Sequence, residues 1–204
     1  MMKKILIVLA SLLAFVVLHQ AFFDTAPVTN PHPTGETIIC FGDSLTFGTG
    51  AGSNEDYPSR LASLIGAEVI NAGVPGDTTA DALKRLEHDV LAHNPRIVLI
   101  TLGGNDLMRD VSRGEAFANL EAIVRRIHQK GALVVVGGIE VPLFDRGFDE
   151  AYEDLQDTTG CLLIPNVLNG LIGKHDLMSD RIHPNSEGYK IMARRFHKEI
   201  EPYL

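Results

Sequence analysis

Four short blocks in this chain carry residues whose side chains can do chemistry together. The blocks are Gly42-Asp43-Ser44-Leu45, Asn71-Ala72-Gly73, Gly103-Gly104-Asn105-Asp106 and Asp180-Arg181-Ile182-His183-Pro184-Asn185. A serine, a histidine and an aspartate can serve as nucleophile, general base and orienting group, and nearby N–H groups can bind an oxyanion. Each block alone is ordinary turn chemistry. Together they indicate acyl transfer, provided that the fold brings them to one place.

The roles follow from the residue types. Ser44 is expected to be the nucleophile and His183 the base that takes its proton. Asp180 precedes His183 by three residues and is expected to accept from the second imidazole nitrogen, which fixes the tautomer. The expected oxyanion donors are the backbone N–H groups of Ser44 and Gly73 and the side-chain amide of Asn105. A glycine at position 73 suits a backbone that closely approaches the substrate.

Asp43 and Asp106 stand beside these residues, and their expected roles are structural. Asp43 shapes the turn after the first strand. We expect activity to fall at acid pH, because His183 must be neutral to act as a base.

The elements that must position these blocks alternate along the chain. Hydrophobic runs predict strands at 38–41, 68–71, 97–102, 133–136 and 161–164. Helical spacing predicts helices at 57–66, 77–93, 113–130 and 149–157, and a last helix after position 186. This alternation predicts one α/β domain with a parallel sheet and helices on both faces. Ligands of such sheets bind beyond the carboxyl ends of the strands, where Ser44, Gly73 and Asn105 fall.

The two cysteines, Cys40 and Cys161, lie in or beside the first and last predicted strands. With strand order 2-1-3-4-5 they would be three strands apart, about 14 Å at the usual strand spacing. A disulfide needs Cα atoms within about 7 Å, so we expect two small core residues instead. No cluster of histidine and cysteine suggests a metal, and no cofactor is expected.

The first 23 residues form a separate unit. Lys3 and Lys4 precede a hydrophobic run of fourteen residues, Ile5 to Leu18. The run is typical of a signal peptide, and residues 5–23 together approach the length of a membrane anchor, so both alternatives stay open. In either case we expect export, to the periplasm or outside the cell, or attachment to the inner membrane through this segment. A proline-containing linker, 24–36, should be extended or disordered.

The net charge of the protein argues against one class of binding partner. The formal net charge is −8, and without Lys3 and Lys4 the remainder carries −10. Nucleic-acid binding needs clustered lysine and arginine, so it is not expected. We expect a monomer whose substrate is a small acyl ester. We expect it to contact a membrane only through its N-terminal segment.

The four blocks give a resemblance to a known family. In order and spacing they resemble those of SGNH (GDSL-type) hydrolases, and the run from Gly42 to Asp81 is similar to the branch of bacterial thioesterase I, lysophospholipase and arylesterase enzymes. The likeness covers nearly everything from Thr37 to Leu204. It implies a flavodoxin-like three-layer α/β/α fold over residues 37–204 and ester hydrolysis without metal or cofactor. It also implies Ser44, Asp180 and His183 as the triad, and Gly73 and Asn105 as oxyanion donors.

Substrate preference is less clear from the sequence. The residues Leu107, Met108, Leu143, Phe144 and Phe148 lie in loops that leave the catalytic edge. Some of them are expected to wall an acyl pocket, with local packing as the alternative. Glu140 puts an acid near that wall, which departs from the branch and leaves acyl preference open.

Three other functions are compatible with parts of the sequence. One is a carbohydrate O-acetylesterase of the same fold. Another is a non-catalytic ligand-binding relative, which an intact set of Ser44, Asn105, Asp180 and His183 disfavours. The last is a nucleotide-binding domain, suggested by the glycines at 48, 50 and 52. No helix opens directly on those glycines, and the second strand ends at an asparagine instead of an acid.

Overall fold

The computed structural model describes residues 27–140 and 147–204. The predicted N-terminal unit and two of the predicted pocket residues, Leu143 and Phe144, lie outside these ranges. Within the ranges, no helix combines the length and apolar character needed to cross a bilayer.

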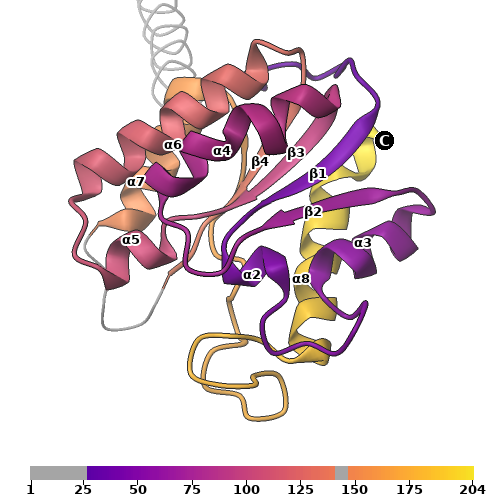
Figure 1. Ribbon diagram of the computed structural model, residues 1–204, viewed down its shortest axis with the longest axis vertical. Helices are drawn as coiled ribbons and strands as arrows, with labels where there is room; N and C mark the ends of the chain where they lie inside the picture. The colour runs from indigo at the N-terminus through magenta and orange to yellow at the C-terminus, as the bar shows by residue number, and fades with distance from the viewer. Residues whose placement is uncertain (1–26, 141–146) are drawn as a thin grey trace, which may run out of the picture.

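A five-stranded parallel sheet forms the centre of the domain (Figure 1). Its strands are β1 (Thr37–Gly42), β2 (Val69–Gly73), β3 (Pro95–Thr101), β4 (Leu133–Gly137) and β5 (Leu162–Ile164). The order β2-β1-β3-β4-β5 confirms the predicted topology, and every pairing is parallel. The predicted strand positions were right to within two residues at each end. Cys161 lies just before β5 and not within it.

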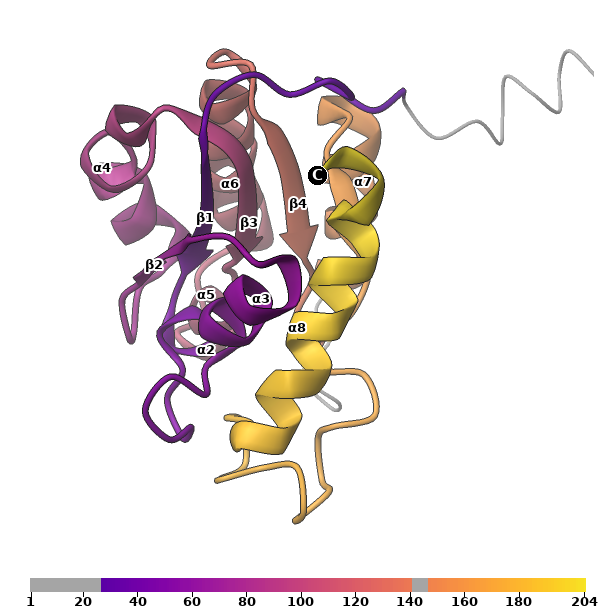
Figure 2. The ribbon, with the colours of Figure 1, turned by 90° about the vertical axis from the view of Figure 1, so that its right-hand side faces the viewer.

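Helices cover both faces of the sheet and complete three layers. One face packs against α4 (Thr79–Asp89), α6 (Arg113–His128) and α7 (Phe148–Thr159), and the other against α3 (Tyr57–Ile65) and α8 (Ser186–Ile200). Figure 2 shows α3 and α8 together on one side of the strands, with α4 and α6 on the other. The predicted helix to His93 ends earlier, at Asp89, and continues as the 3-10 turn η1 (Leu91–His93). A second 3-10 turn, η2 (Glu201–Tyr203), follows α8.

Two short helices were not predicted, and both begin at the catalytic edge. Helix α2 (Ser44–Phe47) starts directly after β1, and α5 (Gly104–Met108) starts just after β3. The Asp43 side chain caps α2 by accepting from the Leu45 N–H, and Gly48 ends it in the left-handed conformation. Elements of four and five residues are too short to show a helical period in the sequence.

The described part of the predicted linker, residues 27–36, bends repeatedly and is hydrogen-bonded to the domain. Thr29 donates its backbone N–H to Gly160 O, and Thr34 donates to Gly131 O. The Asn30 amide donates to the carbonyls of His128 and Ala132. Residues 27–36 are therefore fastened across the ends of α6 and α7, on the side of the sheet away from the strands' carboxyl ends.

Both cysteines are buried and free, as expected. Cys40 lies in the core between the sheet and α3 and α8, whereas Cys161 belongs to the core on the opposite face. Opposite faces of a sheet separate them, which adds to the strand-spacing argument against a disulfide.

Candidate active site

The first strand delivers Ser44 to the edge of the sheet where β3 and β4 also end. Ser44 is the first residue of α2, and Asp43 joins it to β1. Gly42 can only be glycine here, because a Cβ would overlap the Thr46 and Thr101 side chains beneath the turn. These two hydroxyls hydrogen-bond each other, and Tyr57 bonds Thr46, in a fully buried polar group. The turn that carries Ser44 is thus packed against a buried, hydrogen-bonded group of side chains.

Ser44, His183 and Asp180 form a continuous hydrogen-bonded chain. The Ser44 Oγ lies 3.0 Å from His183 Nε2, and His183 Nδ1 lies 2.7 Å from Asp180 Oδ2. The His183 side chain is only 15% exposed. Partial burial of Asp180 opposes its ionisation. The hydrogen bonds from the His183 ring and from the backbone N–H groups of Ile182 and His183 outweigh that effect and lower the pKa of its carboxyl.

The loop that carries the histidine, residues 177–185, is closed by its own hydrogen bonds; we call it the histidine loop. Ser179 donates its N–H to His183 O at 2.9 Å, and Asn185 donates to Leu177 O at 2.9 Å. Asp180 Oδ1 accepts from the Ile182 and His183 N–H groups at 2.8 and 2.7 Å. The spacing of three residues between Asp180 and His183 therefore makes a tight turn in which one carboxylate holds both backbone and ring.

Contacts between two distant segments bring the histidine to the serine. Ser186 donates its hydroxyl to Glu55 at 2.6 Å, and Tyr189 donates to Thr49 O at 2.8 Å. Gly50 packs so closely on the histidine loop that a Cβ would overlap the Ser179 side chain and the Pro184 carbonyl. Gly50 is one of the three glycines, at 48, 50 and 52, that resemble a nucleotide-binding loop. Its lack of a side chain is explained by this close packing on the histidine loop.

Asn105 is also at this edge, but both hydrogens of its amide have partners within the protein. Its Nδ2 donates to Asp43 Oδ2 at 3.1 Å and to the Asp77 backbone carbonyl at 2.9 Å. The next residue, Asp106, is fully buried and accepts from the Thr79 N–H and hydroxyl at the start of α4. Asp106 therefore has the structural surroundings that the sequence led us to expect.

Gly73 lies at the end of β2, and the structure gives a different reason for its lack of a side chain. A Cβ on Gly73 would overlap the backbone of α2 at Thr46 and Phe47, so packing against α2 requires glycine. Its N–H donates to Asn71 Oδ1 at 3.0 Å. Gly73 is not among the residues that line the pocket beside Ser44. An oxyanion would have to share or replace the Asn71 bond to reach this N–H.

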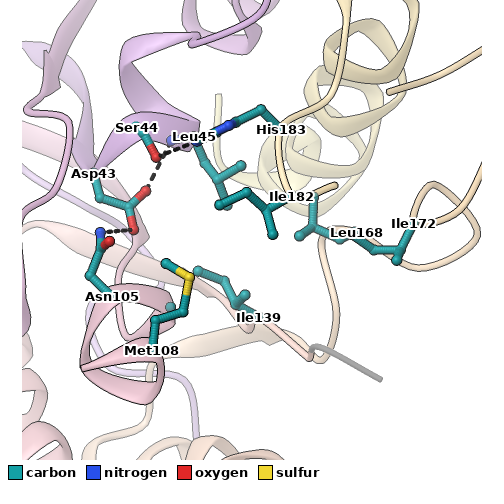
Figure 3. Close-up of a pocket in the computed structure, with 11 residues that line it drawn as sticks. Asp43, Ser44, Leu45, Asn105, Met108, Ile139, Leu168, Ile172, Ile182 and His183 are labelled. Carbon is teal, nitrogen blue, oxygen red and sulfur yellow. Dashed lines mark hydrogen bonds between the residues drawn. The ribbon is translucent and has the colours of Figure 1, made fainter. Parts of the chain in front are cut away.

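A mainly apolar pocket of about 40 Å³ adjoins Ser44, His183 and Asn105 (Figure 3). Of the predicted wall residues in the described part of the chain, Met108 lines it. The structure puts Leu107 in the hydrophobic core instead, with 5% exposure, because consecutive residues of α5 face different ways. Phe148 is also in the core, since it begins α7 and packs against Phe117. Glu140 is exposed and bonds Asn166, and it is not a lining residue. The further apolar lining residues, which the sequence did not reveal, are Leu45, Ile139, Leu168, Ile172 and Ile182.

Two of these missed residues could have been found. Leu45 and Ile182 are sequence neighbours of Ser44 and His183, so a pocket beside the triad would include them. Leu168 and Ile172 come from the loop after β5, whose path no periodicity in the sequence defines.

Asp43 is the most perturbed acid of the site. It is 3% exposed, and burial raises the pKa of its carboxyl to about 7, although the hydrogen bond from Leu45 N–H and the nearness of His183 act to lower it. Asp77 and Asp106 nearby raise it further. A carboxyl that is partly protonated near neutral pH therefore lies directly beside the Asn105 amide.

Comparison with known proteins places the chain among acyl hydrolases. Residues 40–191 match the model of the GDSL-like lipase/acylhydrolase family. An arylesterase of Vibrio mimicus is 31% identical over 180 residues, which cover 83% of this chain and 90% of that protein. An Escherichia coli K12 protein named thioesterase 1/protease 1/lysophospholipase L1 is 27% identical over 194 residues, 91% of this chain and 93% of its own length.

The fold is shared with solved structures as well. The crystal structure of TesA superposes with a TM-score of 0.77 at 27% identity, covering 83% of this chain and all of that one. This likeness agrees with the three-layer α/β/α architecture that the sequence predicted. Since the family model matches residues 40–191, which make up most of the described domain and include all four blocks, the chain belongs to the GDSL-like lipase/acylhydrolase family.

Proposed function

We propose that this protein hydrolyses carboxylic esters through an acyl-enzyme formed on Ser44. The observation that carries the proposal is the hydrogen-bonded chain from Ser44 Oγ through the His183 ring to Asp180 Oδ2, with separations of 3.0 and 2.7 Å. The chain gives the hydroxyl a base within reach, and it gives the base a carboxylate that fixes its tautomer.

In the first step Ser44 Oγ attacks the ester carbonyl while its proton passes to His183 Nε2. Asp180 stabilises the imidazolium that results, because its carboxylate is held in contact with Nδ1. The imidazolium then protonates the departing alkoxide, the C–O bond to the alcohol breaks, and the acyl group stays on Ser44. Water that loses a proton to His183 attacks this acyl-enzyme and releases the carboxylic acid and the free serine.

The proposed oxyanion donors are the Ser44 N–H, the Gly73 N–H and the Asn105 amide. Ser44 opens α2, and the first N–H of a helix has no partner within the helix. The other two donors already bond Asn71, Asp43 and Asp77, so the oxyanion must take a share of those bonds as charge develops. Such donors act mainly on the transition state.

The size of the pocket bears on the acyl group. A volume of about 40 Å³ among the described residues corresponds to roughly three water molecules. That space suits an acetyl or similarly short acyl group. It also favours, as a second candidate, an O-acetylesterase acting on acetylated carbohydrate, which would use the same catalytic residues.

A panel of acyl esters separates these possibilities. Wild-type protein is assayed with p-nitrophenyl acetate, butyrate and octanoate, a medium-chain thioester, a lysophospholipid and acetylated xylan. Ser44→Ala should abolish hydrolysis without unfolding the domain, whereas Ser63→Ala, which changes an exposed serine of α3, should have no effect. A preference for acetylated xylan over simple aryl esters would support the second candidate. Inactivity of the wild type towards every ester would refute both.

We also propose that the domain acts outside the cytoplasm. The support is the basic start and the hydrophobic run of the first 23 residues, which either a signal peptide or an anchor to the inner membrane would have. Mass spectrometry of the mature protein from a cell envelope fraction distinguishes them: an N-terminus after position 18 shows cleavage, and an intact Met1 in the membrane fraction shows anchoring.

A further inference from the structure

Arg85 is a largely buried arginine next to the proposed site, to which neither the sequence nor the proposed mechanism assigns a role. It lies on α4, its side chain is 17% exposed, and its guanidinium carbon is 4.4 Å from the centre of the Phe41 ring. It ion-pairs with Asp89 on its own helix. Its other three hydrogen bonds leave the helix and reach β1, β2 and the loop before α4.

Two of these bonds fix backbone carbonyls near the carboxyl ends of β1 and of the edge strand β2. Nη1 donates to Ala72 O at 2.9 Å, and Nη2 donates to Gly42 O at 2.8 Å. The Ala72 carbonyl and the Gly73 N–H belong to one planar trans peptide and point in opposite directions, so holding one directs the other. The Gly42 carbonyl stands at the last residue of β1, one residue before Asp43 and two before Ser44.

The third bond is made to Asp77, a residue that in turn contacts Asn105, the other proposed oxyanion donor. Nε donates to the Asp77 carboxylate at 2.5 Å. The backbone carbonyl of the same Asp77 accepts from Asn105 Nδ2 at 2.9 Å. Arg85 therefore holds the residue that orients the Asn105 amide.

We propose that Arg85 is a positioning residue, which sets the direction of the Gly73 N–H and the Asn105 amide so that both can bind the oxyanion. The inference rests on the proposed function, because it assigns Arg85 a part in the same reaction. Arg85 is not among the residues that line the pocket beside Ser44, so it acts through the peptides it holds and not on the substrate.

The rigid shape of the guanidinium is what makes this role possible. Its planar fork donates to Gly42, Ala72 and Asp77 from fixed directions, whereas a lysine ammonium is a compact charge on a flexible stem. Arg85→Lys keeps the positive charge but cannot keep three donors in one plane. The substitution should therefore disturb the geometry of the donors more than the overall charge of the site.

A purely structural role makes a different prediction. If Arg85 only joined α4 to β1 and β2, its loss would lower stability without a selective effect on the chemical step. Misdirected oxyanion donors, by contrast, lower kcat and leave KM nearly unchanged, because the lost interaction belongs to the transition state.

The test compares Arg85→Lys with Arg125→Met, assayed with p-nitrophenyl acetate well below each unfolding midpoint. Arg125 donates to one carboxylate and one backbone carbonyl, where Arg85 donates to two of each, and it lies on the far part of α6. We expect kcat to fall at least about tenfold in Arg85→Lys, with KM changed less than about twofold, since removal of a whole oxyanion donor costs about 100-fold or more. Arg125→Met should match the wild type. Wild-type kcat in a folded Arg85→Lys variant would overturn the inference.

A spectroscopic measurement keeps the inference testable apart from catalysis. In ¹⁵N–¹H spectra, Arg85→Lys should shift the Gly73 backbone signal and the Asn105 side-chain signals, and Arg125→Met should shift neither. Unmoved signals would refute the positioning role whatever the activity. If the wild type hydrolyses no ester, the proposed function and the catalytic part of this inference both fail. If the wild type is active and only the Arg85 results fail, the inference alone is wrong.

Discussion

The buried carboxyl of Asp43 should make the stability of this protein depend on pH in a direction opposite to that of most acids. Its native pKa, raised by burial, is about 7, against an ordinary value of 3.8. Between these two values the native state holds a proton that the unfolded chain has lost. Stability is therefore full below the unfolded value and falls as pH rises through the native value.

The magnitude follows from the shift. Each pKa unit corresponds to 1.36 kcal/mol, so Asp43 should cost the native state about 3 kcal/mol between pH 5 and pH 8. Asp43→Asn removes this cost because an amide does not ionise. The variant should be the less stable protein at pH 5, where the new amide faces the N–H groups of Asn105. Its stability relative to wild type should then rise by about 3 kcal/mol by pH 8.

Urea unfolding of both proteins at several pH values, followed by circular dichroism, measures the difference. Every other ionisable group is common to the two proteins, so the difference between their stabilities reports on Asp43 and on its electrostatic coupling to nearby groups such as His183. Asp154→Asn, which changes an exposed acid of α7, is the control for loss of a carboxylate. A difference between Asp43→Asn and wild type that stays constant within 1 kcal/mol from pH 5 to 8 would show that Asp43 is ionised throughout, and the reasoning from burial would be wrong.

Three further predictions concern the surroundings of the site. Gly73→Ala should destabilise the domain by about 1–3 kcal/mol in urea unfolding, because its Cβ would overlap the backbone of α2. Met108→Ala should extend the range of ester chain lengths that are hydrolysed, because Met108 lines the pocket. Leu107→Ala should leave that range unchanged and lower the free energy of unfolding by about 2–5 kcal/mol, because Leu107 lies in the core. Identical chain-length profiles for wild type and Met108→Ala would show that Met108 does not limit the pocket. Gly50→Ala should lower kcat by pushing on the histidine loop. Gly66→Ala, also at a positive φ but with open space around it, should affect only stability, and equal kcat values in the two variants would contradict this.

The sequence predicted the positions of Ser44 and Asn105 well because β1 and β3 are hydrophobic runs followed by glycine and polar residues. Those boundaries fix where Ser44 and Asn105 leave β1 and β3. The short spacing between Asp180 and His183 predicted that they would share a turn. These predictions depend on local patterns and on the topology rules of parallel sheets, and both can be read from one sequence.

What the sequence could not give depends on contacts between distant residues. The partners of the Gly73 N–H and the Asn105 amide are side chains and carbonyls that converge only in the fold. The burial of Leu107 and the exposure of Met108 depend on the direction of α5, a helix too short to predict. In the sequence Arg85 is one more basic residue on an amphipathic helix, and nothing local marks its three contacts beyond α4.

The site is held together in two different ways, which have separate consequences. The sheet positions Ser44 and Asn105, because each follows a central strand, and Arg85 ties the ends of β1 and β2 together. His183 is positioned by loop contacts instead, through Ser186, Tyr189 and the close approach of Gly50. Loops supported by a few polar contacts open at lower free energy than core strands. The hydrogen bond between His183 and Ser44 should therefore break before the domain unfolds. Mild urea should reduce activity before the circular dichroism signal changes.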